Sequence, residues 1–334
     1  MKLNFLSKIL MLTNLVLLTL QLFLMDTFWD FYHYPFLNLM VPFIALINVI
    51  FFVFWIIKFK WPFFLFLFSI LIGFKEWGKL YKFPNNSIPT SSGIKVMSFN
   101  VRLFNSFEWI DSKSVPESIE NFINKVSPDL VCLQEYSKEF GPKFKNYPYQ
   151  YIASSKKNGQ NGLCILSKYP LSNRGRLDFD DSNNSALYAD FFHKKDSIRI
   201  YNVHLESLRI NLEDTLFTQE HSQKFIQRIH SIVQKQEFQI DLFDKVEQKS
   251  NYPTIICTDL NNNAFSRVYK RLKDDRLDAF MLSGEGLGST YKLAHFPFRI
   301  DFIFTDQKFK VINFETHDIK LSDHKPISAL LEWK

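Results

Sequence analysis

The chain changes character near residue 83, and this change constrains its folding more than any other feature. Residues 1–83 are dominated by Phe, Leu, Ile, Val and Trp, whereas the residues beyond Gly93 have the composition of an ordinary globular domain. Two stretches without a charged residue, Ile9–Met25 and Leu37–Ile57, have about the length that a helix needs to cross a bilayer. The sequence therefore predicts an all-α transmembrane region followed by a globular domain.

A third stretch, Trp61–Phe74, is apolar but short for a membrane span. It extends to Tyr81 only if Lys75, Glu76 and Lys79 lie in the interface or pair with one another. We therefore predict an anchor of two to three helices over residues 1–83, near 9–25, 37–57 and 61–81.

The lysines around these stretches predict an orientation in the bilayer. Lys2 and Lys8 precede the first stretch and Lys58 and Lys60 follow the second, so the positive-inside rule places both ends in the cytoplasm. A third span then puts the globular domain outside, whereas a re-entrant third segment leaves it inside. We expect an integral membrane protein with an extracytoplasmic domain. A cleaved signal peptide is the alternative for the first stretch, but no small-residue cleavage site follows it.

The charge balance gives little support to nucleic-acid binding. Residues 1–92 carry seven lysines and three acidic residues, so they hold four of the six excess positive charges of the chain. The globular domain is therefore nearly neutral, whereas a nuclease needs several Lys or Arg side chains to neutralise the phosphates of its substrate. Three cysteines, Cys132, Cys164 and Cys257, lie in apolar strand-like runs and are expected in the core.

The pattern of residues 94–334 predicts an α/β fold for the globular domain. Turn formers at 84–93 (PNNSIPTSSG) predict a linker, and residues 94–334 predict the domain. Helical spacing of apolar residues predicts helices over Val115–Lys125 and from about Leu212 to Glu247. Strands are predicted at Ile94–Phe99, Leu130–Leu133, Leu163–Leu166, Leu187–Phe192, Ile198–Val203, Thr254–Cys257, Ile300–Phe304 and Ile327–Leu331. Many strands with few helices between them predict two packed sheets flanked by helices.

Six short motifs each place a polar residue at or near the end of a strand-like run: SFNVR, LQE, NVHLES, TDLNN, RIDFIF and SDHKP. Mg²⁺ prefers oxygen ligands and is held by one or two carboxylates together with substrate phosphate. Glu135 in LQE is the main candidate carboxylate ligand, and Asn100 in SFNVR offers an amide oxygen. Asp323 in SDHKP is a further candidate, as a ligand or as an orienting group.

The other motifs supply what hydrolysis of a phosphate ester needs besides a metal. Asp259 can orient or deprotonate the attacking water, and Asn261 can steady the phosphate. His204 and His324 can donate to phosphate oxygens, because imidazole carries a proton near neutral pH. Asp301 can hold the His324 ring in the required tautomer.

In these motifs, from about Lys95 to Trp333, the chain resembles the endonuclease/exonuclease/phosphatase superfamily, which includes deoxyribonuclease I and the neutral sphingomyelinases. The resemblance implies a four-layer α/β sandwich with one metal-dependent site at the strand ends. It further implies that Glu135 binds Mg²⁺ or Mn²⁺, that Asp259 activates water, and that His324, paired with an Asp, contacts the phosphate.

The chain departs from the family pattern around its Asp-x-Asn motif. Thr258 replaces the common Gly before this motif, and Leu260 replaces the usual aromatic residue within it. Both changes are expected to alter the turn that presents Asp259. Position 204 carries a His, and in this it is similar to the phosphatase and phospholipase branches of the family. Apurinic endonucleases carry a Tyr at the corresponding position.

The leading hypothesis is a membrane-anchored, divalent-metal-dependent phosphoesterase. Its substrate is either a phospholipid head group at the bilayer or extracellular nucleic acid, in which case the protein is an extracytoplasmic nuclease. A non-catalytic membrane protein that keeps the fold is the alternative from another class. No obligate protein partner is evident, and Tyr188, Arg299 and Tyr291 are expected to line the substrate pocket.

Overall fold

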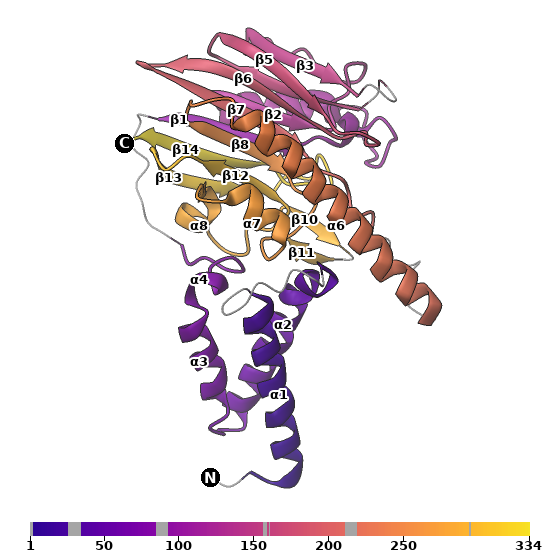
Figure 1. Ribbon diagram of the computed structural model, residues 1–334, viewed down its shortest axis with the longest axis vertical. Helices are drawn as coiled ribbons and strands as arrows, with labels where there is room; N and C mark the ends of the chain where they lie inside the picture. Colours follow the sequence, from indigo (N-terminus) through magenta and orange to yellow (C-terminus); the bar gives the residue numbers. More distant parts are fainter. Residues whose placement is uncertain are drawn as a thin grey trace.

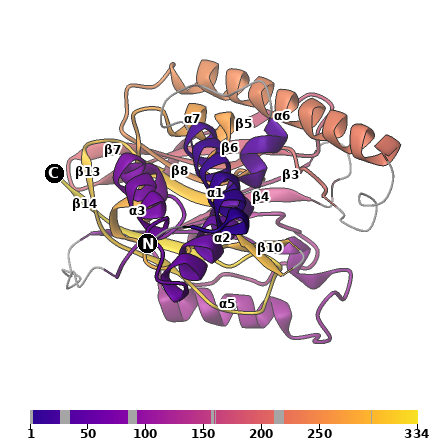
Figure 2. The same ribbon diagram turned by 90° about the horizontal axis from the view of Figure 1, so that it is seen from below.

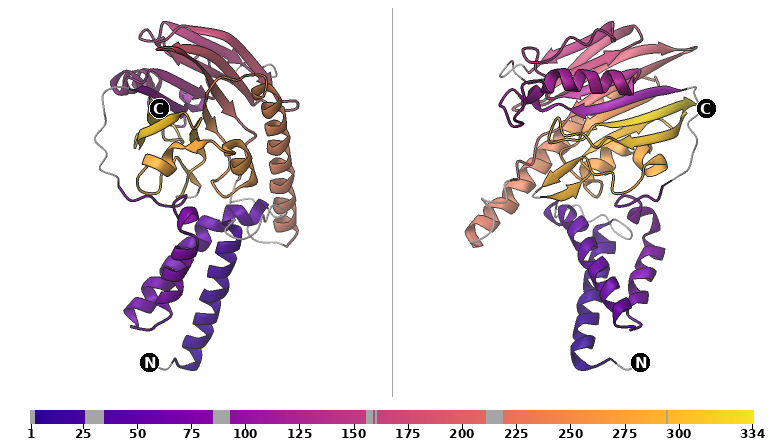
Figure 3. Two further views of the ribbon diagram at one scale, coloured as in Figure 1. Left: turned by 60° about the vertical axis from the view of Figure 1, so that its left-hand side comes forward. Right: turned by 180° about the vertical axis from the view of Figure 1, so that it is seen from behind.

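The computed structural model describes residues 3–25, 35–84, 93–155, 159, 161–210, 219–293 and 295–334. A group of helices from the amino-terminal third projects from one end of a larger unit built on β-sheets (Figure 1). The same two parts are evident from the side and from behind, with the chain's N-terminus at the far end of the helices (Figure 3). Most of the predicted linker, residues 85–92, lies outside the described residues.

The first sheet contains the strands nearest the start and the end of the globular part. Its order is β13 (Phe309–Thr316), β14 (Ile327–Trp333), β1 (Ile94–Asn100), β2 (Leu130–Gln134), β4 (Gly162–Ser167) and β3 (Tyr149–Ser154). The pair β1 and β2 is parallel, and the other neighbours are antiparallel.

The second sheet has the same mixed character. Its order is β5 (Leu171–Asp178), β6 (Ser185–His193), β7 (Asp196–His204), β8 (Thr254–Asp259), β12 (Asp301–Thr305) and β9 (Leu277–Asp278). Here β7 and β8 are the parallel pair. Strands β10 (Tyr291–Leu293) and β11 (Phe296–Phe298) form a separate antiparallel ribbon.

Helices cover the outer faces of both sheets and complete four layers. Helix α5 (Val115–Val126) and helix α6 (Gln219–Glu247) lie on opposite sides of the sheets (Figure 2). The shorter helices are the 3₁₀ turn η1 (Arg102–Asn105), α7 (Arg267–Lys273) and α8 (Ala279–Ser283). The α/β four-layer sandwich expected from the sequence is therefore confirmed.

The two sheets pack through alternating apolar residues. Val96, Cys132 and Ile200 belong to the cluster between the sheets, whereas Met97 and Val131 face the layer of α5. The predicted strands and helices are present, with ends shifted by a few residues, and residues 212–218 of the longer helix lie outside the described part. Cys132, Cys164 and Cys257 are free and buried, as expected.

The predicted anchor forms helices, with a correction to the third. Helices α1 (Phe5–Leu24) and α2 (Pro35–Ile57) are long and apolar enough to cross a membrane, although core helices and signal sequences can meet the same test. In place of one helix near 61–81, α3 (Phe63–Ile72) ends at Gly73 and is followed by the short α4 (Phe74–Trp77). A side chain at Gly73 would meet Leu22 at 3.0 Å, so this glycine permits close packing on α1. Beyond it, Glu76 pairs with Lys79.

A buried polar network joins α1 and α2. Asn14 of α1 donates to Asn48 of α2 at 3.1 Å, and Asn48 donates to Gln21 at 2.6 Å. Trp55 donates to Asn14, and all four side chains are buried. Outward-facing apolar residues of α1 and α2 are instead exposed, among them Leu12, Val16, Ile50, Val53 and Ile57. Helix pairs in lipid are joined in this way, by polar contacts inside and apolar contacts with the surrounding chains.

A buried asparagine joins the two sheets close to their shared edge. The Nδ2 of Asn202, on β7, donates to the carbonyls of Leu133 and Cys164, both at 2.9 Å. Its Oδ1 accepts from Gln134 Nε2 at 2.7 Å. Asn202 therefore fixes the position of β2, which ends just before Glu135.

Replacing Asn202 with Ala removes these hydrogen bonds and leaves their partners buried. An unsatisfied buried polar group costs about 1–3 kcal/mol, so we expect the free energy of unfolding to fall by about 2 kcal/mol. Urea unfolding of the full chain in detergent micelles, followed by near-UV circular dichroism, measures the change. Asn251→Ala, at an exposed position, is the control. An equal loss in both variants would contradict the bridging role.

Candidate active site

The polar residues of the motifs converge because their strands end at one edge. Parallel pairing brings the carboxyl ends of β1 and β2 together, and likewise those of β7 and β8. His204 pairs in register with Asp259, and Asp259 pairs with Asp301 at the start of antiparallel β12. Asn100, at the end of β1, comes from the other sheet. Each of these four residues follows the alternation that faces the other sheet.

A single amide group connects the two sheets at the site. The Nδ2 of Asn100 donates to Asp259 Oδ2 at 2.9 Å and to Glu135 Oε1 at 3.2 Å. Asn100 and Asp259 are buried, and Glu135 is partly buried. Asn100 therefore brings the candidate metal ligand Glu135 and the candidate base Asp259 close together.

Glu135 reaches this cavity through its backbone conformation. Strand alternation would turn the residue after Gln134 toward the α5 layer, on the side of Leu133. Glu135 instead has a φ of 49°, in the left-handed region, which ends the strand and redirects the side chain. Asn261 has a φ of 51° just after β8. Non-glycine residues rarely adopt this conformation, and such strain gathers at functional sites.

His324 and two carboxylates form the most buried part of the site. His324 Nδ1 lies 2.9 Å from Asp301 Oδ2, and its Nε2 lies 3.8 Å from Asp259 Oδ2. Burial opposes the charged ring, yet the carboxylates of Asp301 and Asp259 raise the pKa of His324 to about 10. Burial raises the pKa of Asp259 above its ordinary value, against the opposing effect of His324. His324 is thus a cationic donor beside a carboxylate that gains affinity for protons.

The remaining candidate catalytic residues surround Asp259. His204 Nε2 lies 3.5 Å from Asp259 Oδ2. The Asn261 N–H donates to Asp259 Oδ1 at 2.9 Å, and its Nδ2 donates to the carbonyl of Leu205 at 3.0 Å. Asp259 is consequently held from several sides, although Thr258 and Leu260 replace the residues usual in the family.

Asp323 and Tyr291 lie at the rim of the site. Asp323 pairs with Arg102 at 3.3 Å, and both side chains are about one third exposed. The Tyr291 ring packs on the His324 ring with centroids 5.0 Å apart. Burial raises the pKa of Tyr291, so its hydroxyl remains a hydrogen-bond donor.

Two residues expected to line the pocket lie elsewhere, which corrects the expectation. Tyr188, in the middle of β6, packs against Tyr201 and under the Arg199 guanidinium. Arg299 is buried, pairs with Asp278 at 2.8 Å and stacks on Phe280. Both act in packing because their partners, distant in sequence, turn them away from the strand ends.

Three supporting residues have roles that the sequence reasoning did not assign. Arg102 follows Asn100 in SFNVR and stacks on Trp109, 3.9 Å from its ring centroid. The Ser322 hydroxyl donates to the carbonyl of Asn100 at 2.8 Å. Thr290 accepts from the backbone N–H of Asp301 at 3.2 Å. Arg102 and Ser322 carried a signal, because they end and begin the recognised motifs SFNVR and SDHKP.

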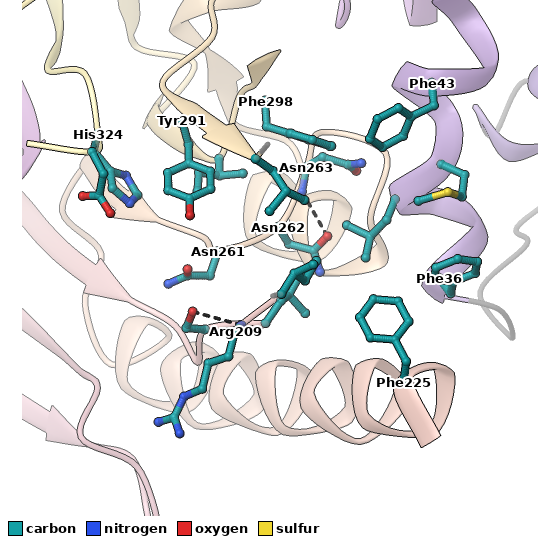
Figure 4. A pocket seen from close by; sticks show the side chains of 18 of the residues that line it. Phe36, Phe43, Arg209, Phe225, Asn261, Asn262, Asn263, Tyr291, Phe298 and His324 are labelled. Carbon is teal, nitrogen blue, oxygen red and sulfur yellow. Dashed lines mark hydrogen bonds between the residues drawn. The ribbon is translucent and has the colours of Figure 1, made fainter. Parts of the chain in front are cut away.

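A cavity of about 540 Å³ opens beside these residues. One end is polar and includes Glu135, Asn261 and His324. The other end is apolar and includes Phe43 of α2 and Phe225 of α6 (Figure 4). The volume lies within the range of small-molecule sites, about 300–1,000 Å³.

The side chains at the polar end fit a hard divalent cation. Glu135 and Asp259 direct carboxylate oxygens at one amide, and Asn100 can present its oxygen after rotation of that amide. Asp259, Asp301 and His324 also offer ligand atoms within 4.8 Å of one another. Mg²⁺ and Mn²⁺ prefer oxygen donors, so the Glu135 side suits them better than the side that holds the imidazole.

The family assignment rests on this arrangement and on a direct match. A model of the endonuclease/exonuclease/phosphatase family matches residues 97–324. The chain belongs to this family. It is a hydrolase that acts on phosphate ester bonds, as members of the family are. No curated protein matches the chain.

Solved structures share the fold at low sequence identity. An endonuclease/exonuclease/phosphatase from Bacteroides vulgatus is 16% identical, with 73% of this chain and 100% of that chain covered and a TM-score of 0.57. The human Nocturnin catalytic domain with bound sulfate is 17% identical, with 72% and 94% covered and a TM-score of 0.55. D. rerio TDP2 with single-stranded DNA product is 15% identical, with 72% and 100% covered and a TM-score of 0.54. These likenesses establish the fold.

Glu135→Gln removes a negative ligand and is expected to weaken Mg²⁺ binding. A ligand at one hundred times its Kd stabilises a protein by about 2.7 kcal/mol, which raises the Tm of the full chain when Mg²⁺ is added. We expect this rise to shrink by more than half in Glu135→Gln. Glu139→Gln, four residues on and exposed, is the control. The same Mg²⁺-dependent rise in both variants would remove Glu135 from the metal site.

Proposed function

We propose that the protein is a membrane-anchored, divalent-metal-dependent phosphoesterase whose site is formed by Asn100, Glu135, Asp259 and His324. The observation that carries the proposal is the shared amide of Asn100, which brings Glu135 and Asp259 together. A fold that had lost its activity would not need to keep a buried and a partly buried carboxylate on one amide, because burying negative charge costs stability.

The geometry supports distinct roles for the chain's own groups. Glu135 and Asn100 would hold Mg²⁺ or Mn²⁺, which would supply positive charge against the phosphate oxygens. Asp259 accepts the proton of the attacking water, which its burial favours. His324 donates to a phosphate oxygen, and Asp301 holds the His324 ring through Nδ1. His204 and Asn261 complete the set of donors around the phosphate.

Helices α1 and α2 support the membrane anchor. Their outward faces are apolar and exposed, while their polar side chains are buried in the interface between them. The N-terminal end of the helices is remote from the sheets (Figure 3), and Lys8 lies in the first turns of α1. Trp55, close to the end of α2, bonds to Asn14 of α1, so Lys58 follows α2 on the same side. The positive-inside rule then favours a cytoplasmic position for that end and an extracytoplasmic active site.

One observation favours the nuclease alternative. Phe107 is 63% exposed and Trp109 is 44% exposed, and their rings lie 5.1 Å apart beside Arg102. Exposed aromatic rings next to a guanidinium can stack on bases of a single strand. Hydrolysis of single-stranded DNA or RNA, compared with phospholipids under Mg²⁺ and then EDTA, decides between the two substrates.

Substitutions in the site are expected to abolish hydrolysis of bis-4-nitrophenyl phosphate. A general base contributes about 10²–10⁴ in rate, so Asp259→Asn should lower kcat by that factor. We expect a loss of the same order in Asp301→Asn, because removal of the carboxylate lowers the pKa of His324 and takes away the positive charge that faces the phosphate. Release of 4-nitrophenol with Mg²⁺ measures both, and EDTA should stop it. Asp275→Asn, on an exposed loop, is the control. Full activity in Asp259→Asn would discredit the assignment.

The orientation is testable with cysteines, because the natural ones are buried. We introduce Phe59→Cys at the remote end of the helices and Asn251→Cys on the globular part, both exposed. A membrane-impermeant maleimide added to spheroplasts should label Asn251→Cys, and should label Phe59→Cys only after lysis. The reverse pattern would place the site in the cytoplasm.

A further inference from the structure

The apolar end of the cavity is built by a helix that is long enough to span a membrane. Phe36, Leu39, Met40 and Phe43 follow helical spacing along one face of α2 and all line the cavity. The opposite wall is formed by Phe225 and Ile226 of α6 and by Leu293 and Phe298 of the β10–β11 ribbon. These three elements are far apart in sequence, so this wall exists only in the folded chain.

Specific contacts hold α2 in this position. The Phe36 ring meets the Phe225 ring edge-on, with centroids 5.8 Å apart. Phe43 packs on Phe296 and Phe298 at 4.1 and 5.5 Å. Asn263, two residues after Asn261, donates to the backbone carbonyl of Asn38 on α2 at 3.0 Å. The apolar wall is therefore attached to the loop that carries a catalytic residue.

We propose that this cavity binds the apolar chain of a membrane lipid whose phosphate ester lies at Glu135 and His324. The proposal rests on the proposed function and names its substrate class. The cavity is continuous between the two ends (Figure 4). Beyond Phe43, α2 presents exposed apolar side chains, so the wall leads to the surface that meets lipid.

The charge of the lining disfavours a nucleic acid in this part of the cavity. Among the described lining residues the basic side chain other than histidine is Arg209, which is 72% exposed and 4.0 Å from Glu206. A polynucleotide needs several cations along its backbone. An apolar chain instead gains affinity with each buried methylene, by about fourfold.

The test compares 4-nitrophenyl alkyl phosphates from ethyl to dodecyl with the full chain in lipid nanodiscs. Water adds to phosphorus and the bond to the 4-nitrophenyl oxygen breaks, which gives 4-nitrophenol and the alkyl phosphate. The ratio of kcat/KM for dodecyl to ethyl reports binding of the chain. Ile226→Asp, in the cavity wall, should lower this ratio at least tenfold. Phe238→Asp lies on the same helix with similar exposure but outside the cavity, and should keep it within twofold.

The two variants also separate the cavity from the bilayer. Partition of dodecyl chains into the nanodisc affects every variant equally, so it cannot produce a difference between Ile226→Asp and Phe238→Asp. An unchanged ratio in Ile226→Asp overturns the lipid proposal while hydrolysis itself still supports the proposed function. Loss of all hydrolysis in the unaltered chain overturns the proposed function instead.

A second measurement needs no activity. Dodecylphosphonate, which is not hydrolysed, should slow alkylation of Ile226→Cys by a maleimide at least fivefold, whereas ethylphosphonate should not. Phe238→Cys should react at the same rate with either. Phosphatidylcholine, sphingomyelin and a polyprenyl phosphate in the nanodisc, compared as substrates and as protecting agents, then distinguish acyl from prenyl chains. Equal reactivity of Ile226→Cys with and without dodecylphosphonate overturns the proposal.

Discussion

The pairing of β8 with its two neighbours positions the chemistry of this enzyme. His204 and Asp301 both stand opposite Asp259, one on each side. Because strand side chains alternate, Asp259 shares the face of Ile255 and Cys257, which pack between the sheets. A slip of one residue would send the carboxylate to the opposite face, so the apolar core that fixes the register also fixes the site.

The side chains become more polar in steps from the apolar core to the active site. Ser98, Gln134 and Asn202 form a buried, neutral, hydrogen-bonded layer between the apolar residues and the charged groups. Neutral amides satisfy one another at little cost, whereas Asp259 and Asp301 lose much hydration on burial. The pairing of Asp301 with His324 offsets part of this loss. The remaining negative charge, shared with Glu135, is the feature that a bound cation would neutralise.

The sequence predicted central strands better than peripheral ones. Strands such as β2 and β8 are fully buried and read as apolar runs, whereas β3 and β5 lie at sheet edges with exposed residues and were not predicted. The apolar helices were predicted from their length, but the division of the third stretch at Gly73 was not. An isolated glycine is tolerated within a helical pattern, so it does not by itself announce a helix end.

The same distinction applies to the site: residues placed by local sequence were predicted, and residues placed by contacts distant in sequence were not. Asn100, His204 and Asp259 end buried strands, and a strand end is visible in a pattern, so these residues were identified. Arg299 precedes a buried strand too, but its orientation depends on Asp278, which only the fold brings near. Asn261 and Glu135 reach the cavity through positive φ, which no spacing of residues announces.

Helix α2 belongs both to the amino-terminal helices and to the wall of the cavity. Its later turns carry exposed apolar side chains, and its first turns close the cavity against α6 and the β10–β11 ribbon. Because Asn263 holds the backbone of α2 and lies in the loop after Asp259, a displacement of the helix would be transmitted to the catalytic loop. With α2 as the proposed membrane anchor, the active site would stand at a fixed height above the bilayer. That geometry would select for substrates whose phosphate lies at the same height.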